Sequence, residues 1–190
     1  MAGSAVTVGV LALQGDFEAH RKAFEQLGVR TAEVRTGRQL ETVDGLVIPG
    51  GESTTMLELI RLESLMEPLR SFGAVRPVFG TCAGAILLAS EVTRPPQESL
   101  GLVDIGVERN AYGRQVHSQV TRILFGGGEL EAVFIRAPII RRVGPAASVL
   151  ATFEGDPVLV EQGRHLVATF HPELTSDRRV QQLFLEKVRI

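Results

Sequence analysis

The sequence predicts an α/β protein with a doubly wound, mostly parallel sheet that is flanked by helices and extended by antiparallel β segments. From residue 6 to residue 89, apolar strand-like segments alternate with helical ones, which is the pattern of a parallel sheet covered on both faces. From residue 102 to residue 170, short β segments follow one another with turns between them. A chain of 190 residues, 44% of them hydrophobic and 22% charged, suits one domain over residues 1–190.

The parallel part begins with a strand, a turn and a helix. Val6 to Leu13 carries no charge, as expected for a strand covered on both faces, and Gln14-Gly15 ends it. Asp16 can cap a helix that runs to Leu27 and stops at Gly28. The next elements are expected in this order: a strand over Val29 to Val34, a short helix around Arg38 to Thr42, a strand over Gly45 to Ile48, one helix capped by Ser53 or Thr54 and extending to Phe72, a strand ending at Val78-Phe79, and a helix over Ala83 to Ala89.

The rest of the chain predicts the antiparallel extension and a closing helix. Glu154-Gly155-Asp156 has the composition of a hairpin turn, whereas residues 94–97 and 125–129 look like surface loops. The closing helix begins near Asp177 and buries an apolar stripe that includes Val180 and Phe184. The β segments are expected over Val103 to Val107, Ser118 to Leu124, Glu129 to Arg136, Ser148 to Phe153, Pro157 to Gln162 and Arg164 to Phe170.

Cys82, the only cysteine, lies between an apolar strand and a helix. Gly80 and Gly84 flank it, which gives Gly-x-Cys-x-Gly, the cysteine counterpart of the Gly-x-Ser-x-Gly nucleophile elbow. Close neighbours on both sides of such a sharp turn leave room only for residues without a Cβ. The helix N-terminus also favours a thiolate over a thiol. A lone cysteine is more often a small buried apolar residue, but this context favours a reactive nucleophile.

The last expected strand leads directly into His171-Pro172-Glu173. In extended backbone, residues two apart point to the same side, so Glu173 can reach the imidazole of His171. A base oriented by a carboxylate completes a Cys-His-Glu triad with Cys82. The other histidines, His20 on the first helix, His117 before a β segment and His165 in a polar turn, are interpreted as surface or structural residues.

Gly50 and Gly51 follow the third strand, at the edge of the sheet where Cys82 is expected. Two adjacent glycines are often a simple turn, but backbone N–H groups at this place could form an oxyanion hole. A phosphate-binding loop is disfavoured, because neither Gly-x-Gly-x-x-Gly nor Gly-Lys-Ser/Thr occurs.

Composition argues against several classes of function. Twenty basic and 22 acidic residues give a formal charge of −2, and the basic residues are scattered, so nucleic-acid binding has little support. We expect no membrane segment, because no apolar run reaches the roughly 18 residues that span a bilayer. One cysteine cannot form an internal disulfide, which fits a reducing cytoplasm. No metal ligand set is convincing, and no cofactor is expected.

Together these features resemble the class I, triad-type glutamine amidotransferases. Within that family the chain is similar to the glutaminase subunits of two-component pyridoxal 5′-phosphate synthases. The motifs that carry the resemblance are Gly80 to Gly84, Gly9 to Gly15, Pro49 to Met56, Arg109 to Gln115, Phe134 to Pro138 and Phe170 to Leu174.

The resemblance implies roles for individual residues. It makes Cys82 the nucleophile and His171 and Glu173 the rest of the triad, with backbone N–H groups of Gly51 and Ala83 as the oxyanion hole. Glutamine is expected at the family's substrate positions, Gly50, Gly51, Glu52, Arg109, Ile135 and Arg136. An acid and an arginine suit the α-ammonium and α-carboxylate of free glutamine.

The implied activity is hydrolysis of L-glutamine to glutamate and ammonia, with the ammonia passed to a synthase subunit that makes pyridoxal 5′-phosphate. Three alternatives stay open at this point. The chain could serve another amidotransferase pathway, act as a different cysteine hydrolase, or use Cys82 as a redox sensor. A sensor would not need His171-Pro172-Glu173, and the other enzymes need not share the motifs at Arg109 and Phe134.

Overall fold

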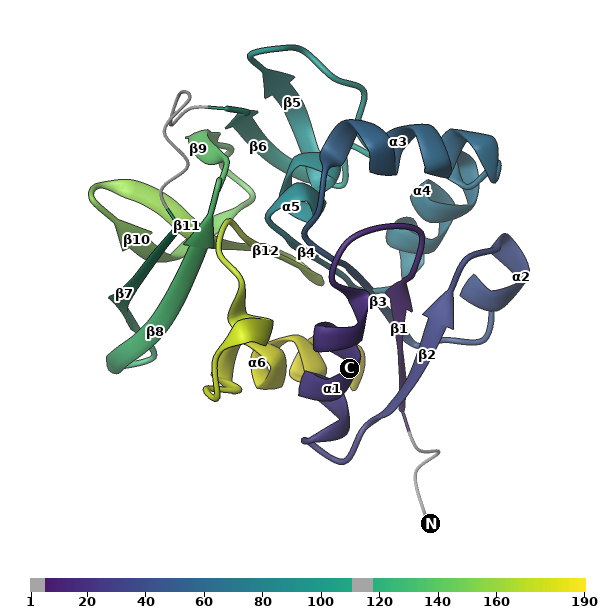
Figure 1. Ribbon diagram of the computed structural model, residues 1–190, viewed down its shortest axis with the longest axis horizontal. Coiled ribbons are helices and arrows are strands. Elements are labelled where there is room, and N and C mark those ends of the chain that lie inside the picture. Colours follow the sequence, from purple (N-terminus) through teal and green to yellow (C-terminus); the bar gives the residue numbers. More distant parts are fainter. Residues whose placement is uncertain (1–5, 111–117) are drawn as a thin grey trace.

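A seven-stranded sheet forms the centre of the computed structural model, which describes residues 6–110 and 118–190 (Figure 1). Its strand order is β10-β11-β12-β4-β3-β1-β2. The strands are β1 (Thr7–Leu11), β2 (Arg30–Val34), β3 (Gly45–Ile48), β4 (Val78–Thr81), β10 (Ser148–Phe153), β11 (Asp156–Gln162) and β12 (His165–Ala168).

Five neighbouring strands, β12, β4, β3, β1 and β2, are parallel, and β10 and β11 continue the sheet in antiparallel fashion. The predicted mostly parallel sheet with an antiparallel extension is therefore confirmed. The hairpin turn between β10 and β11 is also confirmed, since Phe153 pairs with Asp156. Because parallel strands run in one direction, the C-terminal ends of β12, β4, β3 and β1 lie at one edge of the sheet.

Helices cover both faces of the sheet, so the chain builds two hydrophobic cores (Figure 1). Successive strand residues point to opposite faces: Leu46 and Ile48 pack in one core, and Val47 packs in the other. The first core lies under α2 (Gly37–Leu40), α3 (Ser53–Leu62), α4 (Met66–Val75) and α5 (Ala83–Leu88), and the second under α1 (Phe17–Glu25) and α6 (Arg179–Val188).

Two smaller sheets lie beside the central one. One contains β5 (Ala89–Thr93), β6 (Val103–Glu108) and β9 (Ile139–Val143), and the other is the hairpin of β7 (Ser118–Phe125) and β8 (Gly128–Ile135). The sequence analysis missed β5 and β9. It also placed a surface loop over residues 125–129, where Phe125 and Gly128 pair across a tight hairpin turn.

The long helix predicted from Ser53 to Phe72 is wrong, because the chain forms two helices, α3 and α4. Ser64 has a φ of 55°, a left-handed conformation that a continuous helix does not contain. The predicted cap is also wrong. Glu52, not Ser53 or Thr54, caps α3, and its carboxylate accepts hydrogen bonds from the backbone N–H groups of Thr54 and Thr55.

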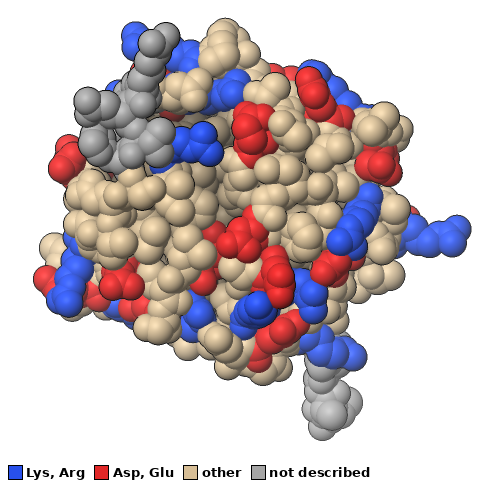
Figure 2. Space-filling view, in the orientation of Figure 1, with Lys and Arg blue, Asp and Glu red and all other residues tan. Residues whose placement is uncertain are grey.

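Within the described ranges, none of the helices has the length and apolar character needed to cross a membrane. Positive and negative side chains are interspersed on the face seen in Figure 2.

Candidate active site

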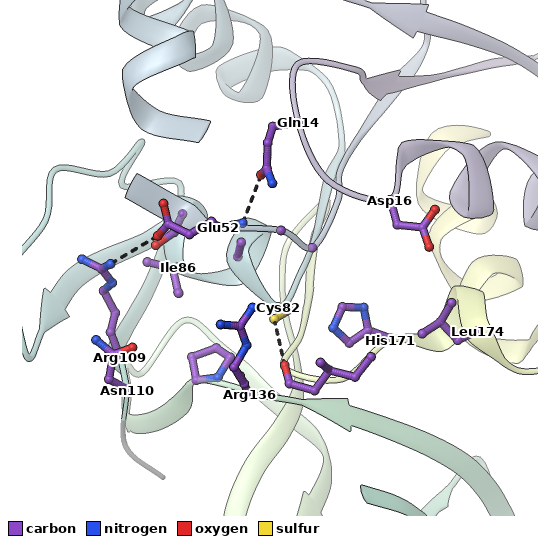
Figure 3. A pocket seen from close by; sticks show the side chains of 16 residues that line it. Gln14, Asp16, Glu52, Cys82, Ile86, Arg109, Asn110, Arg136, His171 and Leu174 are labelled. Atoms are coloured by element: carbon purple, nitrogen blue, oxygen red, sulfur yellow. Dashed lines mark hydrogen bonds and ion pairs between the residues drawn. The ribbon is translucent and has the colours of Figure 1, made fainter. Parts of the chain in front are cut away.

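A cleft of about 340 Å³ opens at the edge of the sheet where the parallel strands end (Figure 3). The connections that follow β1, β3, β4 and β12 bring chain segments far apart in sequence to this edge. The cleft is lined by nine of the ten residues that the sequence analysis assigned to the site: Gly50, Gly51, Glu52, Cys82, Ala83, Arg109, Ile135, Arg136 and His171. Glu173, the tenth, lies buried behind His171.

Cys82 lies at a sharp turn between β4 and α5, as predicted. Its φ of 50° and ψ of −105° are strained for a residue with a Cβ, and such strain costs about 1–3 kcal/mol. The flanking glycines are required by space: a Cβ on Gly80 would lie 2.5 Å from the carbonyl oxygen of Gly84, and one on Gly84 would lie 2.1 Å from that of Ile48. The turn thus holds the sulfur at the wall of the cleft, 3.8 Å from the carbonyl oxygen of Ile135.

His171 and Glu173 form a buried pair beside Cys82. The Nδ1 atom of His171 lies 2.7 Å from Oε1 of Glu173, and the imidazole faces the sulfur in Figure 3. The predicted contact is present, but the predicted backbone is wrong. Pro172–Leu174 forms a short 3₁₀ helix, η1, and not an extended segment, so the turn of this helix brings the two side chains together.

Electrostatics favour a charged imidazole at this position. Burial alone lowers the pKa of His171, but hydrogen bonds with Cys82 and Glu173 outweigh burial and raise that pKa to about 10. Burial raises the pKa of Glu173, whereas His20 and His171 more than compensate, so its pKa is lowered. The carboxylate is therefore ionised at neutral pH and supports a proton on His171.

The Gly50-Gly51 turn lies directly against His171 and Cys82. A Cβ on Gly50 would lie 2.5 Å from Cε1 of His171 and 3.3 Å from Cβ of Cys82. The turn is tied to the loop after β1, because Gln14 Oε1 accepts a 3.0 Å hydrogen bond from Glu52 N and Asp16 N donates to Gly50 O at 3.3 Å. Contacts between the two loops thus fix the backbone that faces Cys82.

Glu52 and Arg109 lie together at the far end of the cleft from His171 (Figure 3). Arg109 donates a 2.8 Å hydrogen bond to Thr54 Oγ1, and its guanidinium lies 3.8 Å from Glu52 Oε1. Burial raises the pKa of Glu52, but hydrogen bonds from Thr54 and Thr55 lower it to about 2. The cleft therefore presents both an anion and a cation, as an amino acid's α-groups require.

Ile135 and Arg136 come from the end of β8 and form the remaining wall of the cleft. Arg136 has a φ of 44°, a left-handed conformation that is uncommon outside glycine. In Figure 3 its side chain extends into the cleft beside Cys82. The backbone and the side chain of this short segment therefore both face the space next to the sulfur.

The sequence analysis missed two residues of this region, and it misplaced His165, which does not line the cleft. Gln14 lies in a quoted motif but was given no role, and His20, interpreted as a surface or structural residue, is fully buried behind Glu173. His165 is not in a polar turn. It is buried in β12, where Nδ1 accepts a 3.3 Å hydrogen bond from Val78 N. His117 and residues 111–115 of the Arg109 motif lie outside the described residues.

Comparison with known proteins places this cleft in a family. Residues 10–190 match the model of the SNO glutamine amidotransferases. The chain belongs to the SNO glutamine amidotransferase family. The pyridoxal 5′-phosphate synthase subunit PdxT of Solibacter usitatus (strain Ellin6076) is 59% identical over 189 aligned positions, and the match covers 95% of this chain and 98% of that protein.

Two further glutamine amidotransferase relatives agree. The pyridoxal 5′-phosphate synthase subunit PdxT of Koribacter versatilis (strain Ellin345) is 55% identical and covers 96% of this chain and 95% of its own. A crystal structure of a glutamine amidotransferase is 46% identical, with a TM-score of 0.91 over 96% of this chain and 99% of that one. The family and fold predicted by the resemblance are confirmed.

Proposed function

We propose that this chain is the glutaminase subunit of a pyridoxal 5′-phosphate synthase and that residues 1–190 act as one glutaminase domain. The observation that carries the proposal is that Cys82 and His171, backed by buried Glu173, line a cleft whose far end holds Glu52 and Arg109. A free glutamine bound with its α-groups at that far end would extend its side-chain amide toward the sulfur. The high identity to PdxT proteins supports the choice of synthase.

The reaction follows from this arrangement. The Cys82 thiolate attacks the side-chain carbonyl carbon of glutamine, and the negative oxygen is held by backbone N–H groups of Gly51 and Ala83. His171, protonated through its pairing with Glu173, donates a proton to the leaving nitrogen, and ammonia departs. The neutral imidazole then takes a proton from water, which cleaves the glutamyl thioester to glutamate and regenerates the thiolate. Among the described residues, no group of three or more His, Cys, Asp or Glu could hold a metal ion.

The partner is the synthase subunit that consumes the ammonia. By resemblance, this subunit combines ammonia with ribose 5-phosphate and glyceraldehyde 3-phosphate. Free ammonia would be protonated and lost in water, so hydrolysis should be coupled to docking. The linked turns at Gln14-Gly15 and Gly50-Gly51 are where docking would complete the oxyanion hole. The cytoplasm is the expected location, because a chain with a single cysteine cannot form an internal disulfide, which fits a reducing compartment.

The test is to measure glutamate release at saturating glutamine from the purified chain, with and without the synthase subunit. We expect a large increase when the subunit is present. Equal rates in the two conditions would refute activation by the partner. If the two proteins failed to associate even with glutamine present, the assignment to this synthase would be wrong.

Replacement of Arg109 by alanine should mainly weaken glutamine binding. One charged hydrogen bond to the α-carboxylate is lost, which corresponds to about 1.5–3 kcal/mol, or roughly a 10- to 150-fold weaker affinity. The maximal rate should change less, because Arg109 lies away from the reacting amide. Isothermal titration of the Cys82→Ala background with glutamine measures this effect without turnover.

Arg122→Ala is the matched control, because this arginine is exposed on β7 and does not line the cleft. Its affinity for glutamine should equal that of the parent. Unchanged affinity in both Arg109→Ala and Glu52→Ala would exclude the proposed substrate orientation.

A further inference from the structure

A second histidine lies behind the candidate triad. His20, on α1, is fully buried, and its Nε2 atom lies 3.3 Å from Oε2 of Glu173 and 2.9 Å from Oγ1 of Thr81. The other oxygen of Glu173, Oε1, is the one that pairs with His171. The carboxylate therefore lies between two imidazoles, one facing the cleft and one facing the protein interior.

The surroundings of His20 fix which of its nitrogens carries the proton. A lone pair on Nε2 would point at an ionised carboxylate oxygen 3.3 Å away, which is unfavourable in a buried site. With hydrogen on Nε2, the ring instead donates to Thr81 Oγ1 and turns the same positive N–H edge toward Glu173 Oε2, a buried oxygen without a hydrogen-bond partner among the described residues. The remaining hydrogen of Thr81 is then free to rotate toward another acceptor.

The polar contacts of His20 all lie on this one edge of the ring. Its Nδ1 atom is buried and, among the described residues, has no hydrogen-bond partner. The ring packs edge-on against Phe79, with the centroids 6.3 Å apart. If His20 only filled the core, an apolar side chain would do so at lower cost, because burying an unpaired nitrogen is unfavourable. The cost is explained if the Nε2 edge has a function.

The structure disfavours a positive charge on His20, which would neutralise the carboxylate of Glu173. Burial lowers the pKa of His20, while Glu173 and Asp16 oppose this effect and His171 reinforces it, with a lowered pKa as the result. The N–H dipole of a neutral ring can attract Glu173 Oε2 across 3.3 Å without neutralising the carboxylate. The full negative charge of the carboxylate then acts on His171.

We propose that His20 is a positioning residue of the glutaminase reaction: through its Nε2–H it fixes Glu173, and so fixes the orientation and protonation of His171. Thr81 connects His20 to the elbow, because it is the last residue of β4, directly before Cys82, and its Oγ1 contacts Nε2 of His20. The inference rests on the proposed function, since it assigns His20 to the same triad.

The test compares two substitutions of His20 in the complex with the synthase subunit. His20→Leu removes the donor at similar volume, and we expect kcat to fall about 10- to 100-fold, as for other residues that orient a catalytic group, with KM for glutamine within about twofold of wild type. His20→Gln carries an amide N–H near the position of Nε2 and should recover most of the loss. Wild-type kcat in His20→Leu, or no recovery in His20→Gln, would overturn the inference.

A double-substitution cycle shows whether His20 acts through Glu173. In a Glu173→Ala background, His20→Leu should change kcat by less than about twofold, because no side chain that His20 could orient toward His171 is left. An equal loss in both backgrounds would contradict the proposal and indicate a general structural effect. If His20→Leu does not fold, His20→Asn replaces it, since its shorter amide is polar but does not reach Glu173, and the same losses are expected.

A second readout does not depend on glutaminase activity and so separates this inference from the proposed function. In spectra of the isolated chain with ¹⁵N-labelled histidine, the hydrogen-bonded Nδ1 proton of His171 should be visible in wild type and His20→Gln. It should broaden or disappear through exchange with water in His20→Leu. An unchanged signal in His20→Leu would overturn the inference, whereas an inactive wild-type complex would overturn only the proposed function.

Discussion

Replacing Cys82 with alanine or serine is expected to abolish glutamine hydrolysis while the fold is retained. The cleft offers no other thiol, because Cys82 is the only cysteine of the chain. A serine hydroxyl ionises far less readily than a thiol, so His171 would not generate an equivalent nucleophile. Alanine and serine both keep a Cβ at the same strained backbone position, so the stability should stay close to that of wild type.

Two measurements check this prediction. Glutamate release is followed in the presence of the synthase subunit, and a glutamine-like electrophile is used to label the wild-type chain. We expect stoichiometric labelling at Cys82 by mass spectrometry and no labelling in Cys82→Ser. Full activity of Cys82→Ala would end the proposed mechanism.

Replacing His171 with asparagine should lower the maximal rate by several orders of magnitude. In the proposed mechanism the imidazole both sustains the thiolate and protonates the departing nitrogen, and His171 is the only histidine among the described residues that line the cleft. Glu173→Gln should cost less, because a group that only orients the imidazole can be partly replaced by an amide. Steady-state kinetics of both variants with the synthase subunit would measure the difference.

Circular dichroism and thermal unfolding serve as the control for these two variants, since both positions are buried. Near-wild-type turnover in a folded His171→Asn variant would contradict its role as the base. A larger loss in Glu173→Gln than in His171→Asn would contradict the order of roles within the triad.

The pattern of apolar residues and glycines over short stretches of the sequence was sufficient to predict the elements that position the site. The strand Gly45–Ile48 has the predicted bounds, and the elbow at Cys82 follows from glycine spacing between an apolar strand and a helix. Each of these signals is contained in a few adjacent residues. The parallel order of the strands then determines that Cys82, Gly50 and His171 meet at one edge.

Features that depend on distant packing could not be predicted in the same way. The break between α3 and α4 at Ser64 is a different case, because Pro68 in the first turn of α4 signals it and was overlooked. The cap by Glu52 was missed because serine and threonine are commoner caps. His20 and Glu173 are far apart in sequence, and their contact exists only because α1 packs on the sheet beside η1.

One labelling experiment tests the central claim most directly. The complex of this chain and the synthase subunit is given glutamine with ¹⁵N in the side-chain amide, ribose 5-phosphate, glyceraldehyde 3-phosphate and an excess of unlabelled ammonium. The account predicts pyridoxal 5′-phosphate with ¹⁵N in its ring, and no ¹⁵N when Cys82→Ser replaces the wild-type chain. Unlabelled product formed while the wild-type chain consumes glutamine would contradict the transfer of ammonia, and ¹⁵N incorporation with Cys82→Ser would contradict the catalytic role of the cysteine.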